Sequence, residues 1–226
     1  VFDPLGHCEG GPVRVDAEAV ERAVEPLRRI RAAVGRRLEV MVDGHGFFQL
    51  PAALRLARTL RELDVLWVED LIRPDCLDTV RQFRQLGGVP VAASEMYSGP
   101  DDFRIVLESG AADYVMIDPT WVGGISQTLK ISDLAGFYNI PVCMHDCTGP
   151  FTLMAGVQVG IARSNVAWQE TVRAHIRMTY PDWIEPAISV REGAIAAPTA
   201  PGLGIAWKDD VFGGEAAVPG SHRESV

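Results

Sequence analysis

Six ionisable residues recur at the ends of short apolar segments, and their spacing is the feature of this 226-residue sequence that first indicates chemistry. Successive closing residues lie 23 to 27 positions apart, about the length of one strand, one helix and two loops. We therefore expect all six at one edge of a repeated strand and helix unit. They are Asp43, Glu69, Glu95, Asp118, His145 and Glu170.

Three of these residues are carboxylates on successive segments, namely Asp43, Glu69 and Glu95. If the segments are neighbouring strands, three like charges meet, and they cannot all stay ionised without a cation. Oxygen-only ligation with open coordination positions suits Mg²⁺. The sequence thus predicts one magnesium ion held by these three residues.

An aspartate and a histidine end the next two segments. On neighbouring strands, Asp118 could hold His145 in one tautomer and raise its basicity, which would make His145 a general base. His45 lies two residues beyond Asp43, on the same side if the strand stays extended, and would reach the same cavity from the opposite wall. One histidine would then take a proton and the other would give one.

Each residue also has a simpler interpretation. A lone acid at a strand end is usually a helix cap or a loop charge, and a buried histidine is often satisfied by main-chain groups. Cys143, His145 and Cys147 alternate and could mimic a zinc site, but a fourth ligand is missing nearby. All six residues occupy the same position in the strand and helix repeat, and this favours the functional interpretation.

Other polar residues near these positions are given lesser roles. Asp70 and Asp146 directly follow closing residues and should point the other way, as loop or capping charges. Trp168 is expected in the barrel core. His7, His175 and His222 are expected in loops, where substrate contact and simple exposure are equally good explanations. Arg173 and His175 could reach the mouth of the site.

The segments between the closing residues predict helices. Asp16 is an N-cap for a helix over 17–34 that Pro26 should kink or divide and Gly35 should close, after a loop over 4–15. Apolar stripes then predict helices over about 51–63, 77–86, 100–109, 124–135 and 150–163. Pro51 suits a first helical turn, and Gly110 should close the helix over 100–109.

Apolar strands that alternate with amphipathic helices predict an α/β fold with a parallel sheet covered by helices. Six units without a break favour a (β/α) barrel over a doubly wound sheet, with the catalytic site at the carboxyl ends of the strands. We assign residues 1–171 to this barrel domain. The pattern fails after residue 171, so we expect 172–226 to be an irregular C-terminal segment that packs on another part of the protein.

Composition limits the function classes. The sequence is 47% hydrophobic and 23% charged, with a net charge of −9. An acidic protein is not expected to bind nucleic acid or an anionic membrane by bulk electrostatics. No apolar run is long enough to span a bilayer and no signal peptide is recognisable, so we expect a cytoplasmic protein. The four cysteines are too few and too irregularly spaced for a disulfide framework.

The motifs resemble those of the enolase superfamily, in its mandelate racemase/muconate lactonizing enzyme branch, and most closely those of acid-sugar dehydratases of the galactonate type. The resemblance covers Val1 to about Gly204. It includes Asp43-Gly44-His45, the form of the first metal ligand that marks the dehydratases. Further family-like signals are Asp118-Pro119, Gly123-Gly124-Ile125-Ser126 and Pro201-Gly202-Leu203-Gly204.

This resemblance implies a modified TIM-type barrel that is incomplete at its N-terminal end. Family members carry an N-terminal capping domain and a first barrel strand, and Val1-Phe2-Asp3-Pro4 looks like the end of the second strand. Residues 172–226 would complete the barrel and pack toward the cap. The resemblance also implies one Mg²⁺, a homo-oligomer and a small sugar acid as substrate.

The implied reaction removes water from an aldonate or aldarate. His145, held by Asp118, would take the proton next to the carboxylate, His45 would protonate the leaving 3-hydroxyl, and Glu170 would stabilise the intermediate best if protonated. The product would be a 2-keto-3-deoxy acid. Two alternatives stay open: a racemase or epimerase of an α-hydroxy acid on the same scaffold, and a catalytically inert barrel fragment.

Overall fold

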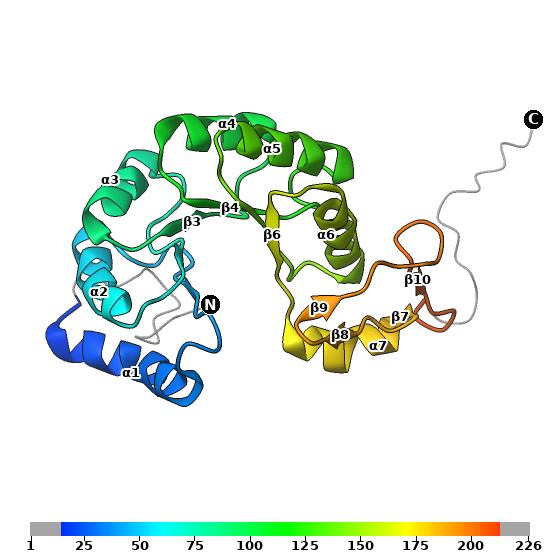
Figure 1. Cartoon of the computed structure of the whole chain (residues 1–226), viewed down its shortest axis with the longest axis horizontal. Helices are drawn as coiled ribbons and strands as arrows, with labels where there is room; N and C mark the ends of the chain where they lie inside the picture. The colour runs from blue at the N-terminus through cyan, green and yellow to red at the C-terminus, as the bar shows by residue number, and fades with distance from the viewer. Residues whose placement is uncertain (1–14, 213–226) are drawn as a thin grey trace, which may run out of the picture.

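The computed structural model of the chain describes residues 15–212. Its centre is a sheet of six parallel strands in chain order, which curves into an open arc in Figure 1. β1 and β6 are the two edge strands of this sheet. The strands are β1 (Val42–Asp43), β2 (Val68–Glu69), β3 (Val91–Ala93), β4 (Tyr114–Ile117), β5 (Val142–Met144) and β6 (Val166–Gln169). The predicted α/β architecture is confirmed as an incomplete barrel.

Helices follow the outer side of the arc, as Figure 1 shows. The helices are α1 (Ala17–Val34), α2 (Leu50–Glu62), α3 (Leu77–Gly87), α4 (Pro100–Ser109), α5 (Ile125–Phe137) and α6 (Pro150–Ala162). Helix α1 precedes β1, and each of the other five lies between two consecutive strands, so these connections are the right length for parallel neighbours. All six predicted helices are present.

The helix ends follow from local chemistry. The Asp16 carboxylate accepts a hydrogen bond of 2.8 Å from the Ala19 main-chain N–H and so caps α1. Gly35 and Gly110 close α1 and α4 at φ values of 57° and 66°, which suit glycine. Pro26 lies within α1 without dividing it.

Two apolar layers flank the sheet. The larger lies between the strands and the helices, where residues such as Leu56, Phe83 and Phe103 are fully or almost fully buried. The smaller lies on the concave side of the arc and contains Trp67, Ala92, Met116 and Cys143. This concave layer is the floor beneath the strand ends.

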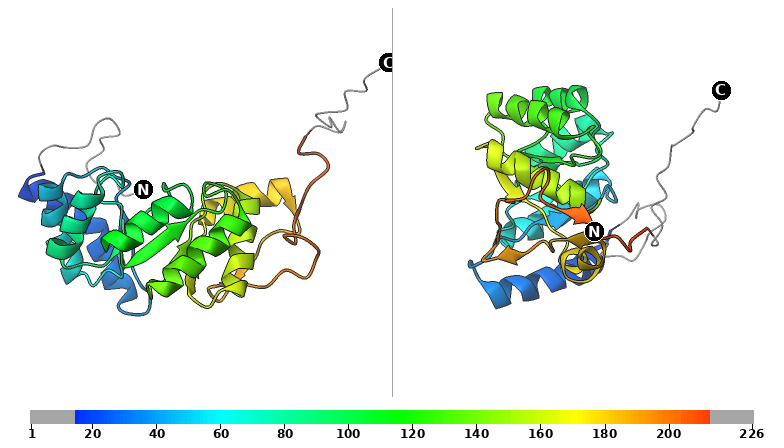
Figure 2. Two further views of the ribbon diagram at one scale, coloured as in Figure 1. Left: turned by 90° about the horizontal axis from the view of Figure 1, so that it is seen from above. Right: turned by 90° about the vertical axis from the view of Figure 1, so that its right-hand side faces the viewer.

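The C-terminal segment is more regular than expected. It contains the π-helix η1 (His175–Thr179), helix α7 (Tyr180–Trp183) and four two-residue strands: β7 (Ile184–Glu185), β8 (Val190–Arg191), β9 (Ala194–Ile195) and β10 (Ala206–Trp207). β7 pairs with β10 and β8 with β9, so in the described part of the chain these strands do not extend the main sheet. Figures 1 and 2 show the segment beyond α6, at one end of the arc.

This segment packs on α6 through a small core of its own. Tyr180, Ile184 and Ile188 are buried against Leu153 and Met154 of α6. The division into a barrel domain (1–171) and a C-terminal segment (172–226) stays a prediction.

Some sequence predictions fall outside residues 15–212. These are most of the loop over 4–15, the strand end at Val1-Phe2-Asp3-Pro4, and the positions of His7 and His222. Within the described residues, no helix combines the length and apolar character needed to cross a bilayer.

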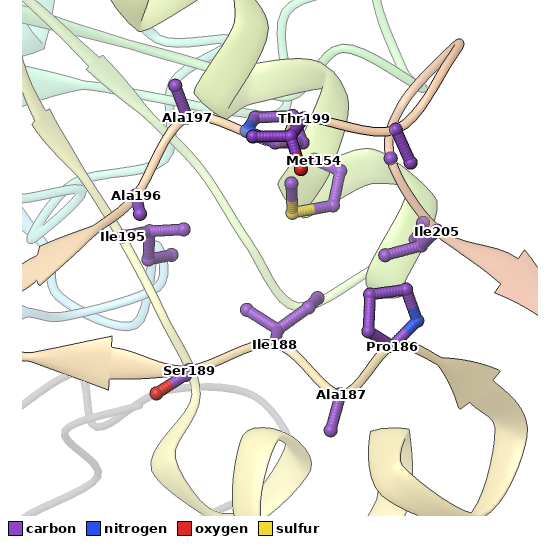
Figure 3. Close-up of a pocket in the computed structure, with 13 residues that line it drawn as sticks. Met154, Pro186, Ala187, Ile188, Ser189, Ile195, Ala196, Ala197, Thr199 and Ile205 are labelled. Atoms are coloured by element: carbon purple, nitrogen blue, oxygen red, sulfur yellow. The ribbon is translucent and has the colours of Figure 1, made fainter.

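An apolar pocket of about 230 Å³ lies between α6 and the C-terminal segment. Met154 of α6 points into it, and Pro186, Ile188 and Ile205 face it from the segment (Figure 3). No ionisable side chain lines this pocket. We therefore place the candidate site at the strand ends instead.

Candidate active site

The alternation of side chains along the strands places five of the six predicted residues on the concave side of the sheet, at the carboxyl ends of the strands. We call this region the mouth of the arc. Residues of the concave layer precede them by two positions, so both point to the same side of the sheet. Met41 precedes Asp43, and Trp67 precedes Glu69. In the same way Met116, Cys143 and Trp168 precede Asp118, His145 and Glu170.

The predicted Asp118 and His145 pair is formed. The Nδ1 atom of His145 lies 2.8 Å from Oδ2 of Asp118, and both side chains are buried. Three further groups donate hydrogen bonds to Asp118: the hydroxyl of Thr148 (2.5 Å) and the main-chain N–H groups of Thr120 (2.7 Å) and Trp121 (3.3 Å). Because these donors favour the carboxylate form of Asp118, the imidazole proton lies on Nδ1, and Nε2 is left to accept a proton.

Electrostatics agree with this assignment. Burial raises the pKa of Asp118, but the hydrogen bonds from His145, Thr148 and Thr120 outweigh it, and the pKa is lowered. Burial lowers the pKa of His145, but the hydrogen bond to Asp118 and the charges of Glu170 and Glu95 raise it above its usual value. His145 is therefore a stronger base than a free imidazole.

Glu170 lies on the Nε2 side of the imidazole. Its Oε2 atom is 3.8 Å from Nε2 of His145 and accepts a hydrogen bond of 2.9 Å from the main-chain N–H of Asp146. Burial raises the pKa of Glu170, against the lowering effects of that hydrogen bond and of His145. This direction agrees with the expectation that Glu170 works best when protonated.

The three predicted metal ligands lie at the same edge of the sheet. Asp43 and Glu69 are register partners at the ends of β1 and β2. Glu95 falls in the turn just after β3, and both Glu69 and Glu95 are buried. Burial, followed by the charges of Asp43, Asp70 and Glu95, raises the pKa of Glu69 well above its usual value.

This donor set fits magnesium in its chemistry, because crowded oxygen ligands that repel one another are relieved by a hard cation. Within residues 15–212, however, no three His, Cys, Asp or Glu side chains are close enough together to form a ready metal cluster. The carboxylates are neighbours but are not drawn onto a common centre. The assignment of Asp43, Glu69 and Glu95 as ligands stays a prediction.

The loop after β1 lies tightly against the loop after β2. The N–H of Gly44 donates to the Glu69 carbonyl (2.8 Å) and that of Gly46 to the Asp70 carbonyl (2.6 Å). A Cβ on Gly44 would lie 2.9 Å from the Leu71 Cα, so only glycine fits there. This contact holds Asp43 beside Glu69.

The backbone at His45 differs from the extended conformation that the sequence predicted. β1 ends at Asp43, and His45 follows in a turn with φ of 48°, where its main-chain N–H donates to Oδ1 of Asp43 (2.8 Å). The expectation of an extended strand through His45 is therefore wrong. The side chain is exposed at the mouth of the arc, and its role as the acid stays a prediction.

Asp70 and Asp146 are buried, which corrects their interpretation as loop or capping charges. Asp70 accepts a hydrogen bond from the Ser94 hydroxyl, and burial raises its pKa. Asp146 accepts one of 3.2 Å from the hydroxyl of Tyr180. An acid next to a strand-end residue gives no sequence signal of such partners, because Tyr180 is 34 positions away.

Two more residues lie close to the Asp118 and His145 pair and were not predicted from the sequence. Thr148 donates to Asp118, and the ring of Trp121 lies with its centre 6.4 Å from that of His145 and is 46% exposed. Trp121 follows the Asp118-Pro119 motif by two residues, and Thr148 lies in the loop after β5. Position in the loops that follow the strand ends was the signal that could have found them.

The remaining predicted residues have mixed outcomes. Trp168 contacts Trp67 and Tyr114 on the concave side but is 37% exposed on the edge strand β6, so the expectation of a core position is wrong. Arg173 is exposed. His175 begins the π-helix η1, so its expected place in a loop is wrong, and it is half-buried against the Tyr180 ring. Cys143 is buried and Cys147 exposed, and both are free thiols.

Taken together, the fold and the site define an α/β barrel domain with three carboxylates and a hydrogen-bonded Asp and His pair at its strand ends. Residues 10–211 match the family described as Enolase C-terminal domain-like. The chain belongs to this family, and the resemblance drawn from its motifs is confirmed.

Similar proteins and solved structures agree with this family assignment. The chain is 34% identical over 186 residues to the D-xylonate dehydratase of Haloferax volcanii, covering 82% of this chain and 45% of that protein. It is 30% identical over 206 residues to the arabinonate dehydratase of Saccharolobus solfataricus, covering 90% and 54%. An enolase of the mandelate racemase subgroup from Agrobacterium tumefaciens superimposes with a TM-score of 0.83 at 33% identity, covering 91% and 55%.

The chain thus spans about half the length of the curated relatives that it matches. The activity of the whole protein is for this reason a proposal.

Proposed function

We propose that this chain is the barrel domain of a magnesium-dependent hydro-lyase that removes water from a sugar acid, an aldonate or aldarate, and gives a 2-keto-3-deoxy acid. The observation that carries this proposal is the buried contact of 2.8 Å between His145 and Asp118, which leaves Nε2 at the mouth of the arc. The names of the relatives support the substrate class.

Proton removal is assigned to His145. Its Nε2 takes the proton from the carbon next to the substrate carboxylate, while Asp118 and Thr148 hold the imidazole in place. Asp43, Glu69 and Glu95 would hold Mg²⁺, which supplies the positive charge that makes this weakly acidic proton removable. Glu170, in its protonated form, donates a hydrogen bond to the substrate carboxylate.

Loss of water is assigned to His45. Its imidazolium gives a proton to the 3-hydroxyl as the carbon–oxygen bond breaks, and water leaves. The remaining enol tautomerises to the 2-keto-3-deoxy acid. Both histidines act at the mouth of the arc, on loops that follow β5 and β1.

The test is a product assay. The protein, expressed with any sequence that precedes Val1 in its gene, is mixed with Mg²⁺ and a panel of aldonic and aldaric acids. A 2-keto-3-deoxy product is then detected with semicarbazide or thiobarbiturate. The His45→Gln variant is expected to exchange the proton next to the carboxylate with solvent deuterium but to form no keto acid.

Two outcomes would overturn the proposal. Formation of an epimer without keto acid would identify a racemase or epimerase. No turnover, together with no rise in melting temperature on adding Mg²⁺, would favour an inert barrel fragment.

A further inference from the structure

The carboxylate of Asp146 is fully buried beside the site, and the mechanism above does not use it. Its Oδ1 accepts the hydrogen bond from Tyr180, and the Val172 main chain also hydrogen-bonds to it. Among the described residues, nothing hydrogen-bonds to Oδ2. A buried carboxylate that is only partly satisfied is costly, and such a group needs an explanation in what it holds in place.

The main chain of Asp146 connects this carboxylate to the reacting side of His145. Its N–H donates to Oε2 of Glu170 at 2.9 Å, and the same Oε2 lies 3.8 Å from Nε2 of His145. Any shift of the Asp146 main chain therefore moves the hydrogen bond that places Glu170.

Tyr180 is well suited to prevent such a shift. It begins α7, is 2% exposed, and belongs to the core that joins the C-terminal segment to α6. Its ring also contacts those of His175 and Trp183, whose centres are 5.4 and 6.3 Å from its own. The hydroxyl is consequently held by packing on several sides.

We propose that Tyr180 is a positioning residue of the site: by anchoring the Asp146 carboxylate, it keeps the Asp146 main-chain N–H on Glu170 and so sets the place of Glu170 against Nε2 of His145. The C-terminal segment thereby contributes to catalysis without touching the substrate. The effect on turnover rests on the proposed function, but the geometry can be tested without turnover.

The first test reads the pKa of His145 by NMR titration of labelled histidine in the purified protein, with the signal assigned through His145→Asn. The ionisable groups that face His145 are Asp118, Glu170, Glu95 and Asp146. In Tyr180→Phe, which keeps the ring, Glu170 is free to move away. The pKa of His145 should then fall by roughly half a unit or more.

A pair of variants at Asp146 separates the effect of its hydrogen bond with Tyr180 from the effect of its charge. Asp146→Asn and Asp146→Ala are both neutral, but only Asn offers an oxygen to the Tyr180 hydroxyl. The pKa of His145 should be lower in the Ala variant than in the Asn variant. This difference should disappear when Glu170 is also replaced by Ala, because the effect acts through Glu170.

The matched control is Ser132→Ala. Ser132 is fully buried in α5, and its hydroxyl donates to the Thr128 carbonyl (2.8 Å), away from the strand ends. Losing this bond should cost similar stability and leave the pKa of His145 unchanged. The proposal is overturned if Tyr180→Phe behaves like this control, or if the Asn and Ala variants still differ in the Glu170→Ala background.

Turnover gives a further check where the proposed activity is present. Tyr180→Phe should lower kcat several-fold and change KM little, because the substrate contacts remain. A normal His145 pKa with normal kcat in Tyr180→Phe would refute the positioning role. A lowered His145 pKa without any dehydratase activity in wild type would refute only the proposed function.

Discussion

The two halves of the site are built in different ways. In the imidazole half, formed by β4, β5 and β6, Asp118 and His145 are hydrogen-bonded to each other, and nearby main-chain N–H groups donate hydrogen bonds to Asp118 and Glu170. In the half formed by β1, β2 and β3, Asp43, Glu69 and Glu95 are neighbours whose charges oppose one another. The imidazole half is thus held together by the protein's own hydrogen bonds, whereas the carboxylate half has a mutual repulsion of the kind that a bound cation relieves.

The largest expected effect comes from removing the base. His145→Asn should lower kcat by about 10²–10⁴-fold, because general base catalysis is lost. The affinity for Mg²⁺, measured by isothermal titration calorimetry, should stay close to that of wild type, since the carboxylate half is untouched. A variant with normal turnover would remove His145 from the mechanism.

The second prediction addresses the carboxylate half. Glu69→Gln should weaken Mg²⁺ binding more than about tenfold, because even the loss of a residue that only supports a ligand costs 10- to 100-fold. The rise in melting temperature on adding Mg²⁺ should shrink accordingly. If Mg²⁺ stabilises this variant as strongly as wild type, the metal lies elsewhere.

A smaller effect is expected from Thr148→Val, which removes one donor to Asp118. A hydrogen bond to a charged group contributes about 1.5–3 kcal/mol. Because three other donors to Asp118 remain, we expect the lower end of this range, which corresponds to a fall in kcat of about tenfold. Thr148→Ser keeps the hydroxyl and should retain near-normal kcat. Equal losses in both variants would mean that the methyl group, rather than the hydrogen bond, is important.

The smallest effect on turnover is expected from Asp146→Asn, but its stability should change with pH. Burial raises the pKa of Asp146 to about 6, above its usual 3.8. The stability linked to this group is therefore fully present below pH 3.8 and is lost as the pH rises through 6.

The Asn variant does not titrate at this position. Relative to wild type, it should gain up to about 3 kcal/mol of unfolding free energy between pH 4 and pH 8. Urea unfolding at both pH values would measure this. A constant difference between the two proteins would show that Asp146 ionises normally in the native state.

Much of the fold could be predicted because its signals are local. Asp16, Gly35, Pro51 and Gly110 mark helix ends through the chemistry of their own few neighbours. The phase of the strand-end residues follows from strand geometry, which is why Asp118 and His145 were paired correctly.

The rest of the site depends on features that sequence patterns do not show. His45 and Asp70 adopt positive φ values of 48° and 40°, which are uncommon for residues other than glycine and break the alternation on which their expected directions depended. Asp146 is buried because Tyr180 reaches it from a distant segment. Such long-range partners become visible only in the folded chain.

The four donors to Asp118 have a stereochemical consequence. Because the carboxylate cannot turn without breaking several hydrogen bonds, it holds the imidazole of His145 in one orientation. Under the proposed function, deuterium exchanged by His145 would enter with a single configuration, and inversion at that carbon would require a second proton donor on the opposite side. Under that function, the handedness of proton transfer would be set by Asp118, a residue to which the proposed mechanism gives no substrate contact.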